Sequence, residues 1–404
     1  MDILYNKEKD IFELKIDNNV IFYNDYSNEC SIYQNEVLNH NNKIQQSEEN
    51  IFFIKIIPSN ACNLNCTYCF SENDRKSKQI LDYTRVQETI EKIAERKNVH
   101  FSVAFTGGGE PTTNLNCIKH VVEAFEGVCD VTFNITSNGI FERECLDYLI
   151  ERKFNVAISI DGNYEIARSQ QTTELKVEKY NQAIENAIAL QNAGLEVSIL
   201  TVLSKDSIEK YAHCKEGVKE LVLDYFYNIG FNAICINFDK GIFSCNNNEI
   251  FLDKIVKICE DIVEWKKIHK NVMVPFKYIY SRNNNYNEFG FCRGINQMSQ
   301  TITIMPNGKY SFCHKVQLDE LLLNEYSEDS IKIFFQEYNV KELRKSAIEH
   351  KKKCKTCISR QICMGDVCPA LLIQNNQTKT DNFCANNRYL RAKLLGNALK
   401  SVLV

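Results

Sequence analysis

The chain has 404 residues, of which 44% are hydrophobic and 25% are charged, and its formal net charge is −4. This length and apolar content are enough for two or three domains around a sizeable core. The nearly balanced charge gives no support for a nucleic-acid-binding surface. No apolar run approaches the roughly 18 residues that span a bilayer, and Met1-Asp2-Ile3 does not open a signal peptide. We therefore expect a cytoplasmic protein with neither a nucleic-acid nor a membrane partner.

Residues 1–50 are rich in asparagine and are predicted to form a segment of their own. Ile11–Ile16 and Val20–Tyr23 alternate apolar and polar residues on either side of Asp17-Asn18-Asn19. This pattern indicates a β-hairpin. We expect the segment to be either a cap that closes the base of the next domain or an element that recognises a leader peptide.

Residues 51–240 alternate short apolar runs with amphipathic helical patterns. Strands are predicted at 51–57, 99–105, 130–136, 155–160, 195–203 and 233–238, and helices at 83–96, 115–127, 142–152, 175–193 and 207–223. Repeated strand–helix units predict an α/β fold with a parallel sheet and right-handed crossovers. The pattern fits both a doubly wound sheet and a curved partial barrel. In either fold, ligands bind at the carboxyl ends of the strands.

Three cysteines, Cys62, Cys66 and Cys69, follow the first of these strands. Three thiolates on one loop can hold three irons of a cubane 4Fe–4S cluster and leave the fourth iron open to a substrate or cofactor. The alternative is a structural zinc site, which closes with four ligands. No fourth cysteine or histidine follows nearby, since the next histidine is His100. The spacing therefore favours an iron–sulfur cluster.

This loop closely resembles the signature of radical S-adenosylmethionine (SAM) enzymes, including the aromatic Tyr68 before the third cysteine. The resemblance implies a partial (β/α)6 TIM-like barrel. It also implies that SAM binds the open iron and is cleaved reductively to a 5′-deoxyadenosyl radical.

The ends of the next strands resemble the SAM-binding motifs of the same family. The backbone of the Gly-Gly-Glu-Pro loop and Glu110 would bind the amino group of SAM, and Ser159 its carboxylate. Family members often carry an arginine twelve residues past this serine; Gln171 stands there instead, and Arg168 is the candidate substitute. By resemblance, the SAM contacts are Tyr68, Gly108, Gly109, Glu110, Pro111, Ser137, Asn138, Ser159, Asp161 and Arg168.

Residues 241–290 are predicted to bridge to a cysteine-rich region, with a long helix at about 249–268 and an extended piece at 271–280. Residues 291–404 then carry a second cysteine set. Its members are Cys292, Cys313, Cys354, Cys357, Cys363, Cys368 and Cys384. This order resembles the SPASM domain, a C-terminal extension with two auxiliary 4Fe–4S clusters, so the resemblance implies three clusters in all.

The resemblance also divides the second set between two clusters. Cys292, Cys313 and Cys368 would hold the cluster nearer the active site, and Cys354, Cys357, Cys363 and Cys384 the distal one. Two zinc ions, with His314 or His350 completing eight ligands, are the alternative. Seven thiolates are one short of two full sets, so the inner cluster is expected to keep an open iron unless Cys245 or Cys259 fills the place. An open iron can bind a substrate thiolate.

The resemblance implies an oxidoreductase that acts on a peptide or protein and takes electrons from a donor such as flavodoxin or ferredoxin. The preferred reaction is a thioether crosslink in a ribosomally made, cysteine-containing peptide with a leader. The alternatives are an anaerobic sulfatase-maturating enzyme that makes formylglycine, and a maturase that forms carbon–carbon crosslinks or epimerises residues. Sulfatase maturases carry an aspartate base where this chain has His314, the candidate catalytic base. A non-enzymatic iron–sulfur carrier would not need the glycine-rich loop.

Overall fold

A computed structural model gives the fold of most of the chain. It describes residues 2–6, 11–16, 19–24, 29–31, 51–69, 71–170, 176–213, 217–239, 242–243, 245–274, 301–311, 322–327, 357–358 and 381–403.

The main sheet alternates with helices along the chain. Its strands are β5 (Ile51–Ile56), β6 (His100–Phe105), β7 (Asp130–Ser137), β8 (Asn155–Ser159), β9 (Val197–Leu203), β10 (Ile234–Phe238), β11 (Thr301–Ile304) and β12 (Tyr310–Ser311). The α-helices are α1 (Glu72–Ser77), α2 (Gln87–Ala94), α3 (Leu115–Phe125), α4 (Arg143–Glu151), α5 (Tyr164–Gln170), α6 (Val177–Asn192), α7 (Lys205–His213), α8 (Tyr225–Ile229), α10 (Glu249–Ile268) and α16 (Asp381–Leu403). Two 3₁₀ turns, η1 (Tyr83–Arg85) and η2 (Pro111–Asn114), and the π-helical η3 (Lys219–Asp224) complete the described helical elements.

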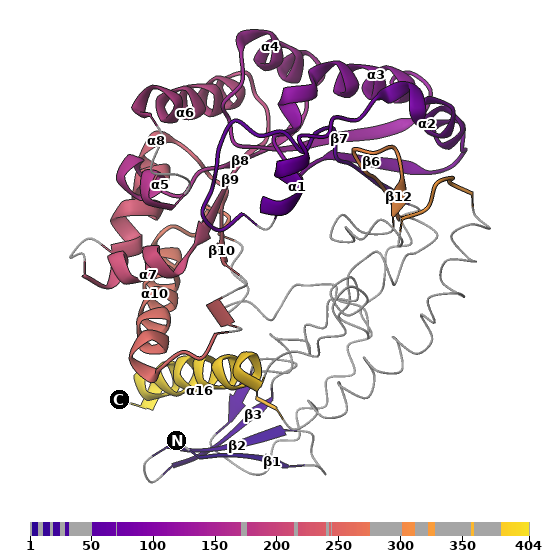
Figure 1. Cartoon of the computed structure of the whole chain (residues 1–404). Helices are drawn as coiled ribbons and strands as arrows, with labels where there is room; N and C mark the ends of the chain where they lie inside the picture. The colour runs from indigo at the N-terminus through magenta and orange to yellow at the C-terminus, as the bar shows by residue number, and fades with distance from the viewer. Residues whose placement is uncertain are drawn as a thin grey trace.

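The order of the strands decides between the two folds that the sequence pattern allows. Among the described residues the sheet runs β10-β9-β8-β7-β6-β5-β11-β12, and β5 to β10 are parallel neighbours in chain order. A doubly wound sheet would reverse its strand order at a switch point. Figure 1 shows the sheet curving, with α2, α3, α4, α6 and α7 outside the curve. The fold is therefore the partial barrel, as expected.

The two faces of the sheet differ in character. On β5 and β6 every second residue is fully buried, and these residues face the helices. Phe52 packs on Phe101, and Phe101 packs edge-on against Phe125 of α3 at 5.3 Å between ring centroids. The intervening residues on each strand are only partly buried and face the inside of the curve. The apolar core thus lies between the sheet and its outer helices.

The predicted strands agree with the observed ones to within one or two residues at each end. One predicted helix, at 207–223, is wrong as a single element. The structure has α7, then the π-helical η3 and the short α8. Gly217 lies between α7 and η3 with φ of 59°, which an α-helix does not adopt. The predicted extended piece at 271–280 is described only to residue 274, where Met273 makes an isolated parallel bridge to Ala233.

The N-terminal hairpin is confirmed as part of a larger sheet. Its strands β2 (Ile11–Ile16) and β3 (Asn19–Asn24) pair antiparallel, and β1 (Asp2–Asn6) and β4 (Glu29–Ser31) extend the sheet on either side. Phe12 and Leu14 are fully buried. The role of this sheet as a cap or as a leader-binding element stays a prediction.

The predicted C-terminal domain contributes two strands to the barrel sheet. β11 pairs in parallel with β5, and β12 pairs with β11 in an antiparallel turn. Tyr310 of β12 donates a hydrogen bond to Thr89 of α2 at 3.0 Å. The division of the chain at residues 50, 240 and 290 stays a prediction, and this part of the C-terminal region is built directly onto the barrel.

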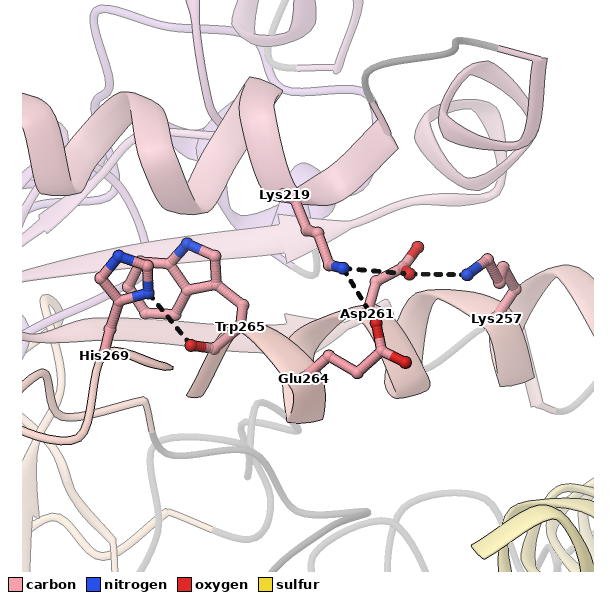
Figure 2. A network of polar contacts seen from close by, with 6 residues as sticks. All are labelled: Lys219, Lys257, Asp261, Glu264, Trp265 and His269. Atoms are coloured by element: carbon pink, nitrogen blue, oxygen red, sulfur yellow. Dashed lines mark hydrogen bonds and ion pairs between the residues drawn. The ribbon is translucent and has the colours of Figure 1, made fainter. Parts of the chain in front are cut away.

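The bridging helix α10 joins the barrel to the C-terminal helix. It contacts α7 and η3 on one side and α16 on the other. Lys219 of η3 binds Asp261 and Glu264 of α10, and Lys257 also binds Asp261 (Figure 2). At the end of α10, His269 stacks on Trp265 at 3.9 Å between ring centroids. These contacts fix α10 against the last helices of the barrel.

Membrane association was not expected from the sequence. Among the helices that the structure describes, none is both long enough and apolar enough to cross a bilayer.

Candidate active site

The cysteine loop leaves the carboxyl end of β5. Cys62, Cys66 and Cys69 are partly exposed. A tight turn holds the last two together, with the Cys69 amide donating to the Cys66 carbonyl at 3.2 Å. The Cys62 sulfur faces the Leu64 amide at 3.4 Å and the Asn138 side-chain amide at 3.9 Å. Such N–H donors stabilise a thiolate and tune a cluster bound to it.

These three thiols fit the cluster that their spacing predicts. Within the described part of the chain, no group of three or more His, Cys, Asp or Glu side chains is arranged to hold a single metal ion. In a cubane each cysteine binds a different iron, so its sulfurs need not converge. The assignment of Cys62, Cys66 and Cys69 to three irons of one cluster stays a prediction.

The glycine-rich loop after β6 packs against the cysteine loop itself. The Gly109 amide donates to Ser59 at 2.8 Å and the Glu110 amide donates to Ala61 at 2.8 Å. A Cβ on Gly109 would overlap the Ala61 carbonyl oxygen and lie 2.5 Å from the Asn60 carbonyl carbon. We expected these glycines to let the backbone approach a ligand. The structure shows that they first let two backbone segments approach each other.

Glu110 accepts hydrogen bonds on both of its carboxylate oxygens. Oε1 accepts from the Thr112 amide at 3.2 Å and its hydroxyl at 2.9 Å, and Oε2 accepts from the Asn138 amide at 2.8 Å. Burial raises the pKa of Glu110, and the bonds from Asn138, Ser137 and Thr112 oppose that rise. The side chain thus ties the glycine loop to the end of β7. Its predicted contact with the SAM amino group stays a prediction.

Asn138 connects the end of β7 to the cysteine loop. Its side-chain amide donates to the Asn63 oxygen at 2.6 Å, and Asn63 in turn donates to the Ile140 carbonyl at 2.8 Å. Asn63 was not predicted as a site residue. An asparagine in a loop carries no signal by itself, and only the fold brings it to Asn138.

Asp161 lies at the end of β8 and binds the cysteine loop through Tyr68. The Tyr68 hydroxyl donates to Oδ2, and the Val202 amide donates to Oδ1 at 2.8 Å. Burial raises the pKa of Asp161 to about 7, against the lowering effect of these two bonds. The pKa of Tyr68 is also raised, first by burial and then by the nearby Asp161. The two predicted SAM contacts therefore bind each other.

The other predicted SAM contacts differ in how far their side chains are buried. Ser137 is buried, and its hydroxyl accepts from the Gly139 amide at 3.0 Å. Pro111 is also buried, at the first turn of η2. Ser159 ends β8 on the partly exposed inner face. Arg168 lies on α5, and its side chain is outside the described residues.

Most of the second cysteine set lies outside the described residues. These positions are Cys292, Cys313, Cys354, Cys363, Cys368 and the candidate base His314. Cys357 and Cys384 are described, and both are partly buried.

The two candidates for an eighth thiolate ligand, Cys259 and Cys245, differ in burial. Cys259 is completely buried in the apolar core on α10. Cys245 is exposed. Its carbonyl accepts a 2.9 Å hydrogen bond from Asn386, two residues beyond Cys384 on α16.

Comparison with known proteins agrees with this geometry. The family described as the radical SAM superfamily matches residues 56–215, from the end of β5 through the cysteine loop and the next four strands. This chain carries a radical SAM domain.

Several proteins are similar to this chain over stretches longer than the radical SAM domain. A radical SAM cyclopropyl synthase of Paramaledivibacter caminithermalis is 25% identical over 59% of this chain and 52% of its own length. The chain thus spans about half of that relative. A cysteine-type anaerobic sulfatase-maturating enzyme of Clostridium novyi is 23% identical over 76% of this chain and 84% of its own length.

A solved structure extends the likeness of the fold beyond the radical SAM domain. The structure described as native anSMEcpe with bound AdoMet matches with a TM-score of 0.67, over 87% of this chain and 98% of its own. Its sequence identity is 19%, so the match concerns the fold alone. The predicted α/β partial barrel is confirmed, and its radical SAM domain spans residues 56–215.

Proposed function

We propose that this radical SAM enzyme modifies a ribosomally made, cysteine-containing peptide and forms a thioether crosslink. The supporting observation is the cysteine loop at the carboxyl end of β5, braced by Glu110, Asn138 and Asp161 at the mouth of a barrel with a half-buried inner face. The similarity to a sulfatase-maturating enzyme over most of its length supports a peptide or protein substrate.

The chain's own residues hold and orient the reacting groups. Cys62, Cys66 and Cys69 would hold a 4Fe–4S cluster, and the loop and strand-end residues named above would hold SAM. When bound, SAM and the reduced cluster supply a carbon radical that takes a hydrogen atom from the substrate. Ala61, Asn63 and Tyr68 of the cysteine loop are hydrogen-bonded to Glu110, Asn138 and Asp161, which follow three different strands, and these bonds keep the loop in place. The partly exposed inner face leaves room for the substrate beside this loop.

Two features of the sequence favour the thioether over formylglycine. Seven cysteines in the C-terminal region are one short of the eight thiolates that two auxiliary clusters need, which leaves a place for a substrate thiolate. His314 also stands where sulfatase maturases carry an aspartate base. Formylglycine formation is the second candidate, because of the similarity to the sulfatase-maturating enzyme.

The test is anaerobic co-expression with each short cysteine-containing reading frame encoded beside the gene, followed by intact-mass analysis and alkylation of the peptides. We expect the loss of two hydrogens per link and a cysteine that no longer reacts with the alkylating agent. Cys66→Ala should abolish the product. Cys129→Ala, a partly exposed cysteine outside the loop, is the matched control and should retain it.

Other products would contradict the thioether proposal in distinct ways. An aldehyde in place of the thiol would assign formylglycine formation. Loss of two hydrogens with a still reactive cysteine would assign a carbon–carbon bond. Peptides of unchanged mass, from an enzyme that still cleaves SAM, would exclude these peptides as substrates of a crosslinking or formylglycine-forming reaction.

A further inference from the structure

The inner face of the sheet is polar across its middle strands, and there its polar groups satisfy one another. The Asn134 amide donates to the Ser102 hydroxyl at 3.3 Å, and Asn155 donates to the Asn134 oxygen at 3.2 Å. The Thr132 hydroxyl lies 3.0 Å from His100 Nε2. This part of β6, β7 and β8 needs no ligand to complete its hydrogen bonds.

The neighbouring strands β5 and β11 are different. Register pairs Lys55 with Thr303, and Phe53 with Thr301, so these four side chains lie on the inner face. Thr303 is 0% exposed and Thr301 is 5% exposed, yet neither hydroxyl has a hydrogen-bond partner. Among the described residues Lys55 is partly buried, and no hydrogen bond or ion pair to it is found. Its neighbour across β6 is Ala104, which is not acidic.

The Lys55 ammonium and the hydroxyls of Thr301 and Thr303 can all be satisfied by the same kind of ligand. A partly buried ammonium without a counter-charge is unfavourable, and so is a buried hydroxyl without a partner. A carboxylate accepts hydrogen bonds from both groups, and its single negative charge matches the single lysine. Lys55 and Thr303 each precede the last residue of their strand. They therefore lie at the end of the sheet that leads into the cysteine loop.

We propose that Lys55 and Thr303, with Thr301 beside them, form a subsite that binds a carboxylate of the peptide substrate, from an aspartate or glutamate near the modified residue. This inference rests on the proposed peptide-modifying function and adds to it a preference for peptides with an acidic residue near the modified one. The subsite would hold the peptide against the β5–β11 side of the barrel, directly below the cysteine loop.

The test measures peptide binding to the reconstituted holoenzyme with SAM, by anaerobic calorimetry without reductant. The probes are short peptides that are blocked at both ends and carry one central cysteine. Each peptide has a single glutamate, which is placed in turn at each of the remaining positions. A matched peptide with glutamine in place of the glutamate is the control for each. N-acetylglutamate α-amide serves as a minimal carboxylate probe. At one or more positions the glutamate peptide should bind about tenfold more tightly than its glutamine control, as a charged hydrogen bond provides.

Three variants distinguish a specific loss of the carboxylate subsite from a general loss of folding or stability. Lys55→Gln should abolish the preference for glutamate. Thr303→Val keeps the side-chain shape and removes an unpartnered hydroxyl, so it should reduce the preference without lowering the melting temperature. Lys92→Gln, an exposed lysine of α2 that pairs only with Glu88 in the described structure, should keep the preference.

The outcomes distinguish this proposal from the proposed function. Peptides that bind equally with glutamate and glutamine, or a preference that survives Lys55→Gln, would overturn the subsite and leave peptide modification standing. If no peptide binds but N-acetylglutamate α-amide binds wild type and not Lys55→Gln, the subsite is supported and the peptide substrate is excluded. If no probe binds, the subsite is overturned.

Discussion

Asp161 joins the cysteine loop to two strand ends through one carboxylate. Tyr68 donates to one oxygen and the Val202 amide to the other. Burial outweighs both bonds and raises the pKa from 3.8 to about 7. Tyr211, which was not predicted, has a buried hydroxyl without a hydrogen-bond partner and interacts electrostatically with Asp161. The charge on Asp161 is therefore unfavourable in the folded protein.

This pKa shift predicts how stability depends on pH. Between about pH 4 and pH 7 the folded protein holds a proton on Asp161 that the unfolded chain has released, so the free energy of unfolding should fall as the pH rises through this window. Asp161→Asn should remove this part of the slope. Urea unfolding of the apoprotein at several pH values measures it. Asp147→Asn, at an exposed ion pair with Arg143, should keep the wild-type slope, and an unchanged slope in Asp161→Asn would contradict the prediction.

At the mouth of the barrel, the conformation of one loop depends on the conformation of another. The glycine loop after β6 and the cysteine loop after β5 are joined by backbone hydrogen bonds, and no side chain fits between them at Gly109. Gly108 has φ of 97°, and a Cβ there would lie 2.5 Å from Asn60 Oδ1. The geometry of the cluster site therefore depends on the glycine loop.

Gly109→Ala should separate the two loops. We expect it to lower the free energy of unfolding by about 1–3 kcal/mol, as overpacking does, and to reduce both cluster loading and SAM affinity. Iron analysis and SAM titration measure the last two effects. At Gly127, with φ of 74°, no atom lies within 4 Å of an added Cβ. Gly127→Ala should therefore cost only backbone strain, and equal loss of iron in both variants would refute a specific role for the loop contact.

The C-terminal region is attached to the barrel at two places in the described structure. β11 pairs with β5, and α16 packs on α10. Asn386 of α16 binds the carbonyls of Phe243 and Cys245, which precede α10. Cys384 lies two residues before Asn386 on the same helix, so its backbone is near the bridging segment.

Iron content tests the arrangement of the whole molecule. We expect about twelve irons per chain, as three 4Fe–4S clusters. Cys384→Ala should lose about four irons and keep SAM cleavage, since Cys62, Cys66 and Cys69 are untouched. Cys66→Ala should lose a similar amount and also lose SAM cleavage. Zinc in place of the auxiliary iron, or unchanged iron in Cys384→Ala, would refute the auxiliary-cluster assignment.

Local patterns in the sequence determined the strands of the barrel, most of its helices and the cysteine loop. Alternation, helical periodicity and ligand spacing are properties of neighbouring residues, so they can be recognised without the fold. The helix predicted at 207–223 failed because a single glycine conformation interrupts it. The motifs at the strand ends are also local, and their resemblance to radical SAM motifs identified Tyr68, Glu110, Asn138 and Asp161 as candidate SAM contacts.

Only the tertiary structure decided which of these residues touch each other. It selected the partial barrel, paired β11 with β5, and showed that Gly109 faces backbone and that Tyr68 binds Asp161. It also brought Asn63 to Asn138, and Lys55 to Thr303. These pairs are far apart in the chain and carry no shared local pattern. Their contacts and their burial arise only when the whole sheet is assembled, because strand order and register set which side chains are neighbours.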